Sequence, residues 1–183
     1  MVTFRTKATD ADIVLRVLRR TRQIRDFRPE PVPDELLNEI LEVGRWTGSA
    51  KNRQPARFVL IRDRARLDRL AELAPTARHL SRAAAGIAIV MPGENEEWDA
   101  YDEGRVAERL LVAANAVDLG AGIGWATPSA RAAVADLLGV TPPAFVRTFV
   151  SIGYPSEAAM APKSAPGTAR RPLADVVRYE RFG

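Results

Sequence analysis

The chain of 183 residues contains no cysteine and a single histidine, His79. These absences exclude disulfides, thiolate metal sites, a thiol nucleophile and any metal site or relay built from several histidines. His79 stands among Thr76, Ala77, Arg78 and Ser81, and this setting predicts a position on the surface. We therefore expect no metal in this protein.

Long apolar runs are also missing. No stretch approaches the roughly 20 apolar residues of a membrane span, and Met1–Arg5 lacks the apolar core of a secretory signal. We therefore expect a cytoplasmic protein with no membrane partner.

Lysine is scarce, since all but three of the 27 basic residues are arginine, and the net charge is +4. The arginines are spread along the chain and form no basic tail, so we expect no nucleic-acid partner.

The length and an apolar content of 46% indicate one domain over residues 1–183. Apolar periodicity and capping residues predict helices at 9–20, 33–46 and 101–119, with shorter ones after Asp63 and Ser129. Continuous apolar runs predict buried strands at 58–61, 86–91 and 145–152. Residues 155–183 are expected to form an extended C-terminal arm that ends in an apolar docking segment, which suggests exchange with a partner subunit.

A polar loop, Ser49-Ala50-Lys51-Asn52-Arg53-Gln54-Pro55, lies between the second helix and the first strand. Loops held by rigid flanks often carry function. The side-chain amides of Asn52 and Gln54 can each offer a donor and an acceptor to a planar heterocycle. A plain polar turn is the alternative interpretation.

Two further segments carry candidate binding residues. Arg22 and Arg25 flank a short extended stretch, where both planar guanidinium groups can reach one phosphate. The alternative is that both arginines are simply solvated. Gly120 and Gly122 follow the long helix, where the absence of a side chain lets backbone approach a ligand closely. A helix C-cap followed by a strand is the alternative there.

These motifs, in this order, resemble the nitroreductase-like family of FMN-dependent oxidoreductases along nearly the whole chain. The matching segments are Arg22-Gln23-Ile24-Arg25-Asp26-Phe27, Ser49–Pro55, Leu119-Gly120-Ala121-Gly122, Ile152-Gly153-Tyr154-Pro155 and Arg170-Arg171-Pro172-Leu173. The resemblance implies a mixed α/β (α+β) fold with a mostly antiparallel central sheet flanked by helices. It also implies a homodimer that exchanges its C-terminal arms and holds FMN at the interface.

The family's signatures imply a role for each matching residue. Arg22 and Arg25 would bind the phosphate of FMN, and Gln23, which replaces the usual serine, would serve the phosphate or the ring. Asn52 and Gln54 would meet the pyrimidine edge of the flavin.

The remaining signatures complete the predicted site. Ser49 would lie near the ribityl chain or the phosphate, and Arg170 would approach the phosphate, with Arg171 as its competitor. Gly120 and Gly122 would bring a backbone N–H to flavin N5. Ala56 stands where relatives commonly carry tryptophan, which leaves the substrate preference open.

The function implied by the resemblance is electron transfer from NAD(P)H to a small electron-poor acceptor, a nitroaromatic or a quinone. The family usually works by a ping-pong scheme through flavin N5, so no side chain is expected to act as acid, base or nucleophile. Two alternatives stay open. One is a flavin-sequestering protein without turnover, and the other is a specialised member that fragments its flavin or dehalogenates an aromatic substrate.

Overall fold

The protein is built around a four-stranded sheet whose described strand pairs are all antiparallel, in the order β1-β2-β4-β3. The computed structural model describes residues 9–162, 164 and 170–182. In chain order its elements are α1 (Asp10–Arg20), α2 (Asp34–Arg45), the 3-10 turn η1 (Ala50–Asn52), β1 (Arg57–Ile61), α3 (Arg64–Leu73), η2 (Pro75–Arg82), β2 (Ala85–Met91), α4 (Glu96–Ala116), β3 (Gly120–Trp125), η3 (Pro128–Ala130), α5 (Arg131–Leu138), β4 (Phe145–Gly153), α6 (Glu157–Met160) and α7 (Leu173–Val176).

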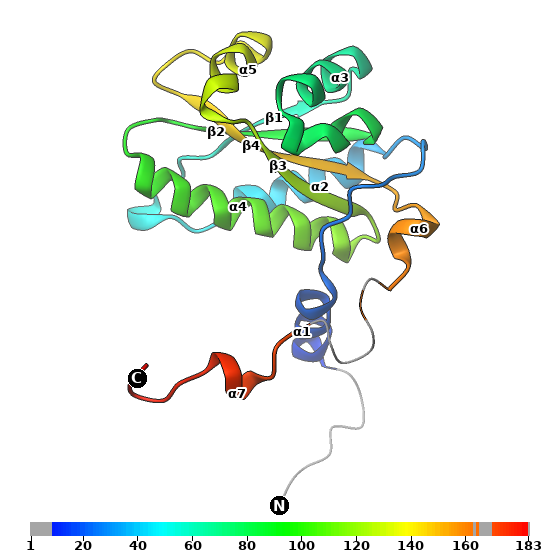
Figure 1. The fold of residues 1–183 in the computed structure, drawn as a ribbon, viewed down its shortest axis with the longest axis vertical. Coiled ribbons are helices and arrows are strands. Elements are labelled where there is room, and N and C mark those ends of the chain that lie inside the picture. The colour runs from blue at the N-terminus through cyan, green and yellow to red at the C-terminus, as the bar shows by residue number, and fades with distance from the viewer. Residues whose placement is uncertain (1–8, 163, 165–169, 183) are drawn as a thin grey trace, which may run out of the picture.

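Helices cover both faces of the sheet, which gives three layers (Figure 1). Successive side chains of a strand point to opposite faces, so Ile87 and Ile89 of β2 pack with α2 and α4, whereas Ala88 packs with the α3, η2 and α5 layer. This central strand is buried on both faces, as its continuous apolar run predicts. The mixed α/β fold with an antiparallel sheet is therefore confirmed.

Helix starts follow local capping chemistry. The side chain of Thr9 accepts a hydrogen bond from the backbone N–H of Asp12, and Asp63 does the same for Arg66 at the start of α3. Two predicted starts are wrong. The long helix begins at Glu96 because Asn95 caps it, and it ends at Ala116 instead of residue 119. α5 begins at Arg131, because Ser129 lies within η3 and does not cap it.

Gly120 and Gly122, which follow the long helix, lie in strand β3 at an outer edge of the sheet. β3 contains three glycines, and this composition hid the strand because glycine has a low strand propensity. The strand is part of the alternative interpretation, a helix C-cap followed by a strand, but the residue that caps α4 is Val117 and not a glycine.

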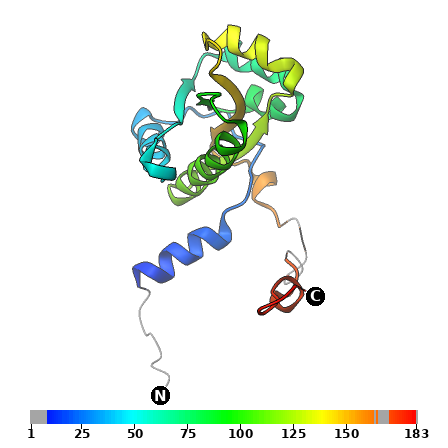
Figure 2. The same cartoon turned by 90° about the vertical axis from the view of Figure 1, so that its left-hand side faces the viewer.

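Two segments extend away from the sheet. Figures 1 and 2 show α1 and the C-terminal part around α7 standing outside the three layers. α1 has no buried residue, and its apolar Val14 and Leu18 are 56% and 50% exposed. In the C-terminal segment Leu173 is 72% exposed and Phe182 is 91% exposed. These two segments therefore expose apolar side chains in the single chain.

Residues 1–8 and, in the predicted C-terminal arm, residues 163, 165–169 and 183 lie outside the described part of the chain. The described part of the arm contains two short helices, α6 and α7.

The longest described helix, α4, carries too many charged side chains to span a bilayer, and no other described helix is long and apolar enough to do so.

Candidate functional site

The segment after α1 runs in extended form across β3. The backbone N–H of Ile24 donates to the carbonyl of Ala121 at 2.7 Å, and Phe27 forms an isolated bridge with Pro155. Ile24 and Phe27 are buried, whereas Gln23 and Arg25 are exposed. The alternation of an extended chain turns Ile24 toward the protein and presents its neighbours Gln23 and Arg25 on the opposite side.

Gln23 and Arg25 are both held against the middle of β3. Arg25 Nη2 donates to Gln23 Oε1 at 2.7 Å and to the carbonyl of Ile123 at 2.9 Å. Gln23 Oε1 also accepts the backbone N–H of Ile123 at 3.1 Å. The predicted phosphate ligand Arg25 is thus fixed in place by a network that includes the predicted residue Gln23.

Arg25 opens onto a cavity of about 710 Å³, which we call the Arg25 cavity. Its polar and aromatic lining includes Arg25, Asp26, Arg78, His79, Arg82 and Trp125. Three guanidinium groups face one carboxylate, that of Asp26, which lies 3.2 Å from Arg82. Arg25 and Arg78 have no carboxylate within ion-pair distance in the described chain. The cavity therefore carries excess positive charge and suits an anion.

His79 is the chief residue that sequence reasoning misplaced. It is 5% exposed, and its Nδ1 lies 2.7 Å from the hydroxyl oxygen of Ser151 on β4. The surface prediction was wrong because η2 packs on the sheet and turns His79 inward with Ala77 and Leu80. Its Nε2 is buried and has no hydrogen-bond partner among the described residues.

The environment of His79 keeps its imidazole neutral. Burial lowers its pKa from 6.5 to about 4, and the positive charge of Arg25 acts in the same direction. The backbone carbonyls of Ile123 and Thr76 oppose this shift more weakly. No sequence signal identified this residue, since nothing local places η2 against the sheet.

Arg22 has a different environment from Arg25. Its Nη2 donates to the carbonyl of Ala159 at 2.7 Å, and its Nη1 donates to that of Ala161 at 3.3 Å. In the described chain its guanidinium therefore holds the start of the C-terminal arm to the N-terminal segment. A contact between Arg22 and a phosphate remains a prediction.

Gly120 and Gly122 give the N-terminal segment room to cross β3. A Cβ at Gly120 would lie 2.7 Å from Ile24 Cγ2, and one at Gly122 would lie 2.6 Å from the Ile24 carbonyl oxygen. Both distances are too short for real Cβ contacts, so a larger residue would displace Ile24 and with it Arg25. This packing accounts for the glycines, and a backbone contact to a flavin from them remains a prediction.

The Ser49–Pro55 loop adopts an unusual backbone. Lys51, Asn52 and Gln54 all have positive φ, at 51°, 53° and 49°. Left-handed backbone costs a residue other than glycine roughly 1–2 kcal/mol, and such strain clusters at functional sites. The hydroxyl of Ser49 stabilises the loop by accepting the backbone N–H of Gln54 at 2.8 Å. Asn52 and Gln54, whose side-chain amides are the predicted ring contacts, are both exposed.

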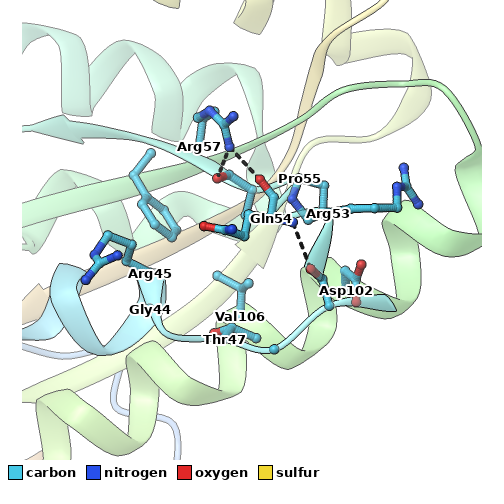
Figure 3. Close-up of a pocket in the computed structure, with 13 residues that line it drawn as sticks. Gly44, Arg45, Thr47, Arg53, Gln54, Pro55, Arg57, Asp102 and Val106 are labelled. Carbon is cyan, nitrogen blue, oxygen red and sulfur yellow. Dashed lines mark hydrogen bonds between the residues drawn. The ribbon is translucent and has the colours of Figure 1, made fainter. Parts of the chain in front are cut away.

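This loop borders a second cavity, of about 530 Å³, which we call the Arg57 cavity (Figure 3). Its lining includes Arg45, Thr47, Gln54, Arg57, Phe58 and Asp102. The cavity combines arginine and amide groups with an apolar wall, and Ser49 and Gln54 are the two predicted flavin contacts that line it.

The two cavities do not meet within one chain. The loop leads into β1, whereas Gln23 and Arg25 lie along β3, and these are the two outer strands of the sheet. Three strand spacings separate them, or about 14 Å. No described pocket is lined by residues of both groups. Arg170 lines neither cavity, and its segment lies apart from the sheet (Figures 1 and 2).

Comparison with known proteins is consistent across sequence and structure. Residues 18–88 match the model of the nitroreductase family. A candidate NADH dehydrogenase/NAD(P)H nitroreductase of Archaeoglobus fulgidus is 28% identical over 151 residues, which covers 78% of this chain and 86% of that protein.

Solved structures extend the likeness. A candidate nitroreductase of Desulfovibrio desulfuricans, in complex with FMN, is 30% identical with a TM-score of 0.80, and the match covers 97% of this chain and all of the other. The NADPH:FMN oxidoreductase of Vibrio harveyi, complexed with NAD+, has a TM-score of 0.79 at 22% identity, with 93% and 78% covered. The second likeness shows the fold alone.

Proposed function

The chain belongs to the nitroreductase family, and on that premise we propose that it uses FMN to carry electrons from NAD(P)H to a small electron-poor acceptor. When bound, FMN supplies the hydride chemistry at N5, and the protein supplies position and electrostatics. A nitroaromatic or a quinone is the acceptor class, and alternate binding of donor and acceptor in a ping-pong scheme is the proposed kinetic order.

The observation that carries this proposal is the donor set of the Arg25 cavity. Arg25 and Arg78 provide positive charge that no described carboxylate neutralises, as a phosphate requires. His79 adds a buried Nε2 without a partner, which a polar ligand group can satisfy. The exposed indole of Trp125 offers an aromatic face at the same cavity. These residues fit a ligand that joins a phosphate to a planar ring.

The amide loop supplies the other half of the proposed site from a second copy of the chain. Asn52 and Gln54 would bond the pyrimidine edge of the ring, and Ser49 would support the ribityl chain. About 14 Å of sheet separates this loop from Arg25 in one chain. A homodimer that places the loop of one protomer over the Arg25 cavity of its partner would unite the two halves.

The exposed apolar surfaces support the same assembly. Val14 and Leu18 on α1 and Leu173 on α7 lack a described partner layer in the single chain. A dimer that exchanges the C-terminal arms would cover them, and Arg170 would then approach the phosphate from the partner's arm. Apolar, interwoven interfaces of this kind are typical of obligate dimers.

The deciding experiment begins with the absorbance spectrum of the purified protein and release of its chromophore. Bound FMN, together with NAD(P)H oxidation that depends on an added nitroaromatic or quinone, is the expected result. Flavin without turnover would favour the sequestering alternative, and flavin fragments or released halide would favour the specialised one. Arg66→Gln on the exposed face of α3 provides a surface control for Arg25→Gln.

A further inference from the structure

The Arg57 cavity contains polar groups that the described chain leaves without partners. Thr47 is 9% exposed, and its hydroxyl has no hydrogen-bond partner among the described residues. A buried hydroxyl without a partner costs roughly 1–3 kcal/mol, so a bound molecule that supplies an acceptor would recover this energy. Thr47 lines the cavity beside Val106 (Figure 3).

Arg57 is the cation of this cavity whose charge is not neutralised. Its Nη1 donates to the carbonyls of Gln54 and Ala56, at 2.6 and 3.0 Å, which orients the guanidinium against the loop (Figure 3). Within the described ranges it has no carboxylate at ion-pair distance, and its Nε and Nη2 donate no hydrogen bond to a described residue. These remaining N–H groups are donors for an anion.

The other charged residues of the lining are already paired. Arg45 forms two hydrogen bonds with Glu42, which lowers the pKa of Glu42 to about 2. Asp102, the acidic residue of the lining, lies 3.3 Å from Arg105.

Arg53 is also engaged elsewhere. It lies 3.4 Å from Glu94, stacks on Trp98 and extends away from the cavity (Figure 3). The Nη1 of Arg53 is buried without a hydrogen-bond partner among the described residues, but Glu94 balances its charge, so Arg57 is the cation of the lining whose charge is not balanced.

The remaining wall is apolar and includes the aromatic ring of Phe58, on which a planar molecule can stack. Phe58, Val106, Pro55 and Ala56 contribute it, and a volume of about 530 Å³ is in the range of small-molecule sites. Gln54 lies in the same lining, so a molecule in this cavity would lie next to the residue that is proposed to hold the flavin edge.

We propose that the Arg57 cavity binds a planar substrate through an oxyanion, with Arg57 and Thr47 as the specificity-determining residues. This inference rests on the proposed function, because a molecule beside Gln54 receives electrons only if that loop meets a flavin. The oxyanion belongs either to a carboxylate on the electron acceptor or to the 2′-phosphate of NADPH.

The test compares matched probes on the flavin-loaded protein. Tryptophan fluorescence titrations with 4-nitrobenzoate and 4-nitrobenzamide, which differ chiefly in charge, measure affinity without turnover. We expect the parent to prefer 4-nitrobenzoate, and Arg57→Gln to weaken its binding roughly 10- to 100-fold while the amide is unaffected. Arg57→Lys should keep part of the preference, and the control Arg66→Gln should keep all of it.

Thr47→Val gives a second measurement that does not depend on the loop. The substitution keeps the shape and removes the unpartnered hydroxyl, so stability should be maintained while 4-nitrobenzoate binding falls about three- to tenfold. If Arg57→Gln instead removes a preference for NADPH over NADH, the oxyanion is the 2′-phosphate of NADPH, the electron donor. The proposal is overturned if neither variant changes the ratio of the affinities for 4-nitrobenzoate and 4-nitrobenzamide, or the ratio of the affinities for NADPH and NADH.

Two further outcomes separate this inference from the proposed function. If Arg57→Gln weakens FMN tenfold and leaves riboflavin unchanged, the cavity holds the cofactor phosphate and the substrate proposal is wrong. A protein that prefers 4-nitrobenzoate but never oxidises NAD(P)H would retain the anion site and refute the proposed activity. A protein that oxidises NAD(P)H but shows no preference for 4-nitrobenzoate over 4-nitrobenzamide would retain the proposed activity and refute the anion site.

Discussion

The imidazole Nδ1 of His79 lies 2.7 Å from the hydroxyl oxygen of Ser151, beneath the wall of the Arg25 cavity. The same hydroxyl donates to the carbonyl of Gly122 at 3.2 Å. Because that carbonyl can only accept, this geometry assigns the imidazole proton to Nδ1 and leaves the lone pair on the unpartnered Nε2. η2, β3 and β4 are thereby joined by one polar network.

His79 should make stability depend on pH. Its pKa is about 4 in the folded chain and 6.5 in the unfolded one, so the unfolded state binds more protons between these values. Stability from this group is therefore complete above about pH 7 and falls as the pH drops toward 4, by roughly 2–3 kcal/mol. Urea unfolding of the parent and of His79→Asn across pH 4.5–8 measures this, and the variant should lose most of the slope. Equal slopes would contradict the assignment.

Arg25→Gln should weaken FMN binding roughly 10- to 150-fold, because a charge-assisted phosphate contact is worth about 1.5–3 kcal/mol. Riboflavin, which lacks the phosphate, should bind parent and variant alike. Equilibrium titration of the two flavins gives the comparison. Retention of parental FMN affinity would remove Arg25 from the site.

Arg22→Ala should act first on structure, since its guanidinium holds the carbonyls of Ala159 and Ala161. We expect a loss of stability of about 1–3 kcal/mol and faster proteolysis after residue 155. Limited proteolysis of parent and variant tests this expectation. Unchanged cleavage would mean that the two bonds do not restrain the arm.

The strained loop predicts that two glycine substitutions stabilise the fold alike but differ in their effect on FMN affinity. Lys51→Gly relieves a positive φ and should stabilise the protein by roughly 1 kcal/mol without changing flavin affinity. Gln54→Gly relieves similar strain but removes the proposed ring contact, so it should stabilise the fold and weaken FMN. Thermal unfolding of the apoprotein and FMN titration measure the two effects. If Gln54→Gly also binds FMN as the parent does, Gln54 does not contact the ring and the strain of the loop has another role.

Removing the hydrogen-bond partner of the buried Glu103 carboxylate should lower the stability of the protein. Glu103 is 2% exposed and accepts hydrogen bonds from Nε and Nη2 of Arg147. Arg147→Met should destabilise the protein by roughly 3 kcal/mol, whereas the double variant with Glu103→Met should recover most of that loss. Denaturant unfolding of the three proteins gives the coupling, and additive single effects would show that the pair does not interact.

The proposed dimer should depend on α1. Leu18→Asp places a charge on its exposed apolar surface and should shift the protein from dimer toward monomer or aggregate, with loss of FMN. Arg16→Ala on the same helix should behave as the parent. Sedimentation velocity at micromolar concentration is the measurement, and a folded parental monomer there would rule out an obligate dimer.

Local chemistry in the sequence predicted most of the elements. The apolar runs 58–61, 86–91 and 145–152 lie in β1, β2 and β4, because continuous apolar strands are buried on both faces. Thr9 and Asp63 begin helices because their side chains satisfy backbone donors within three residues. Each of these signals acts between near neighbours in the chain.

The tertiary structure decided what depends on distant contacts. β3 is a strand although it is rich in glycine, because its partner is β4 and its glycines admit Ile24. His79 is buried because η2 packs on a sheet that forms from strands remote in sequence. Gln23 and Arg25 join one cavity and Ser49 and Gln54 another, on opposite outer strands. The sequence by itself determined which residue types carry binding chemistry, whereas strand order determined which of them meet, since pairing joins segments that no local pattern connects.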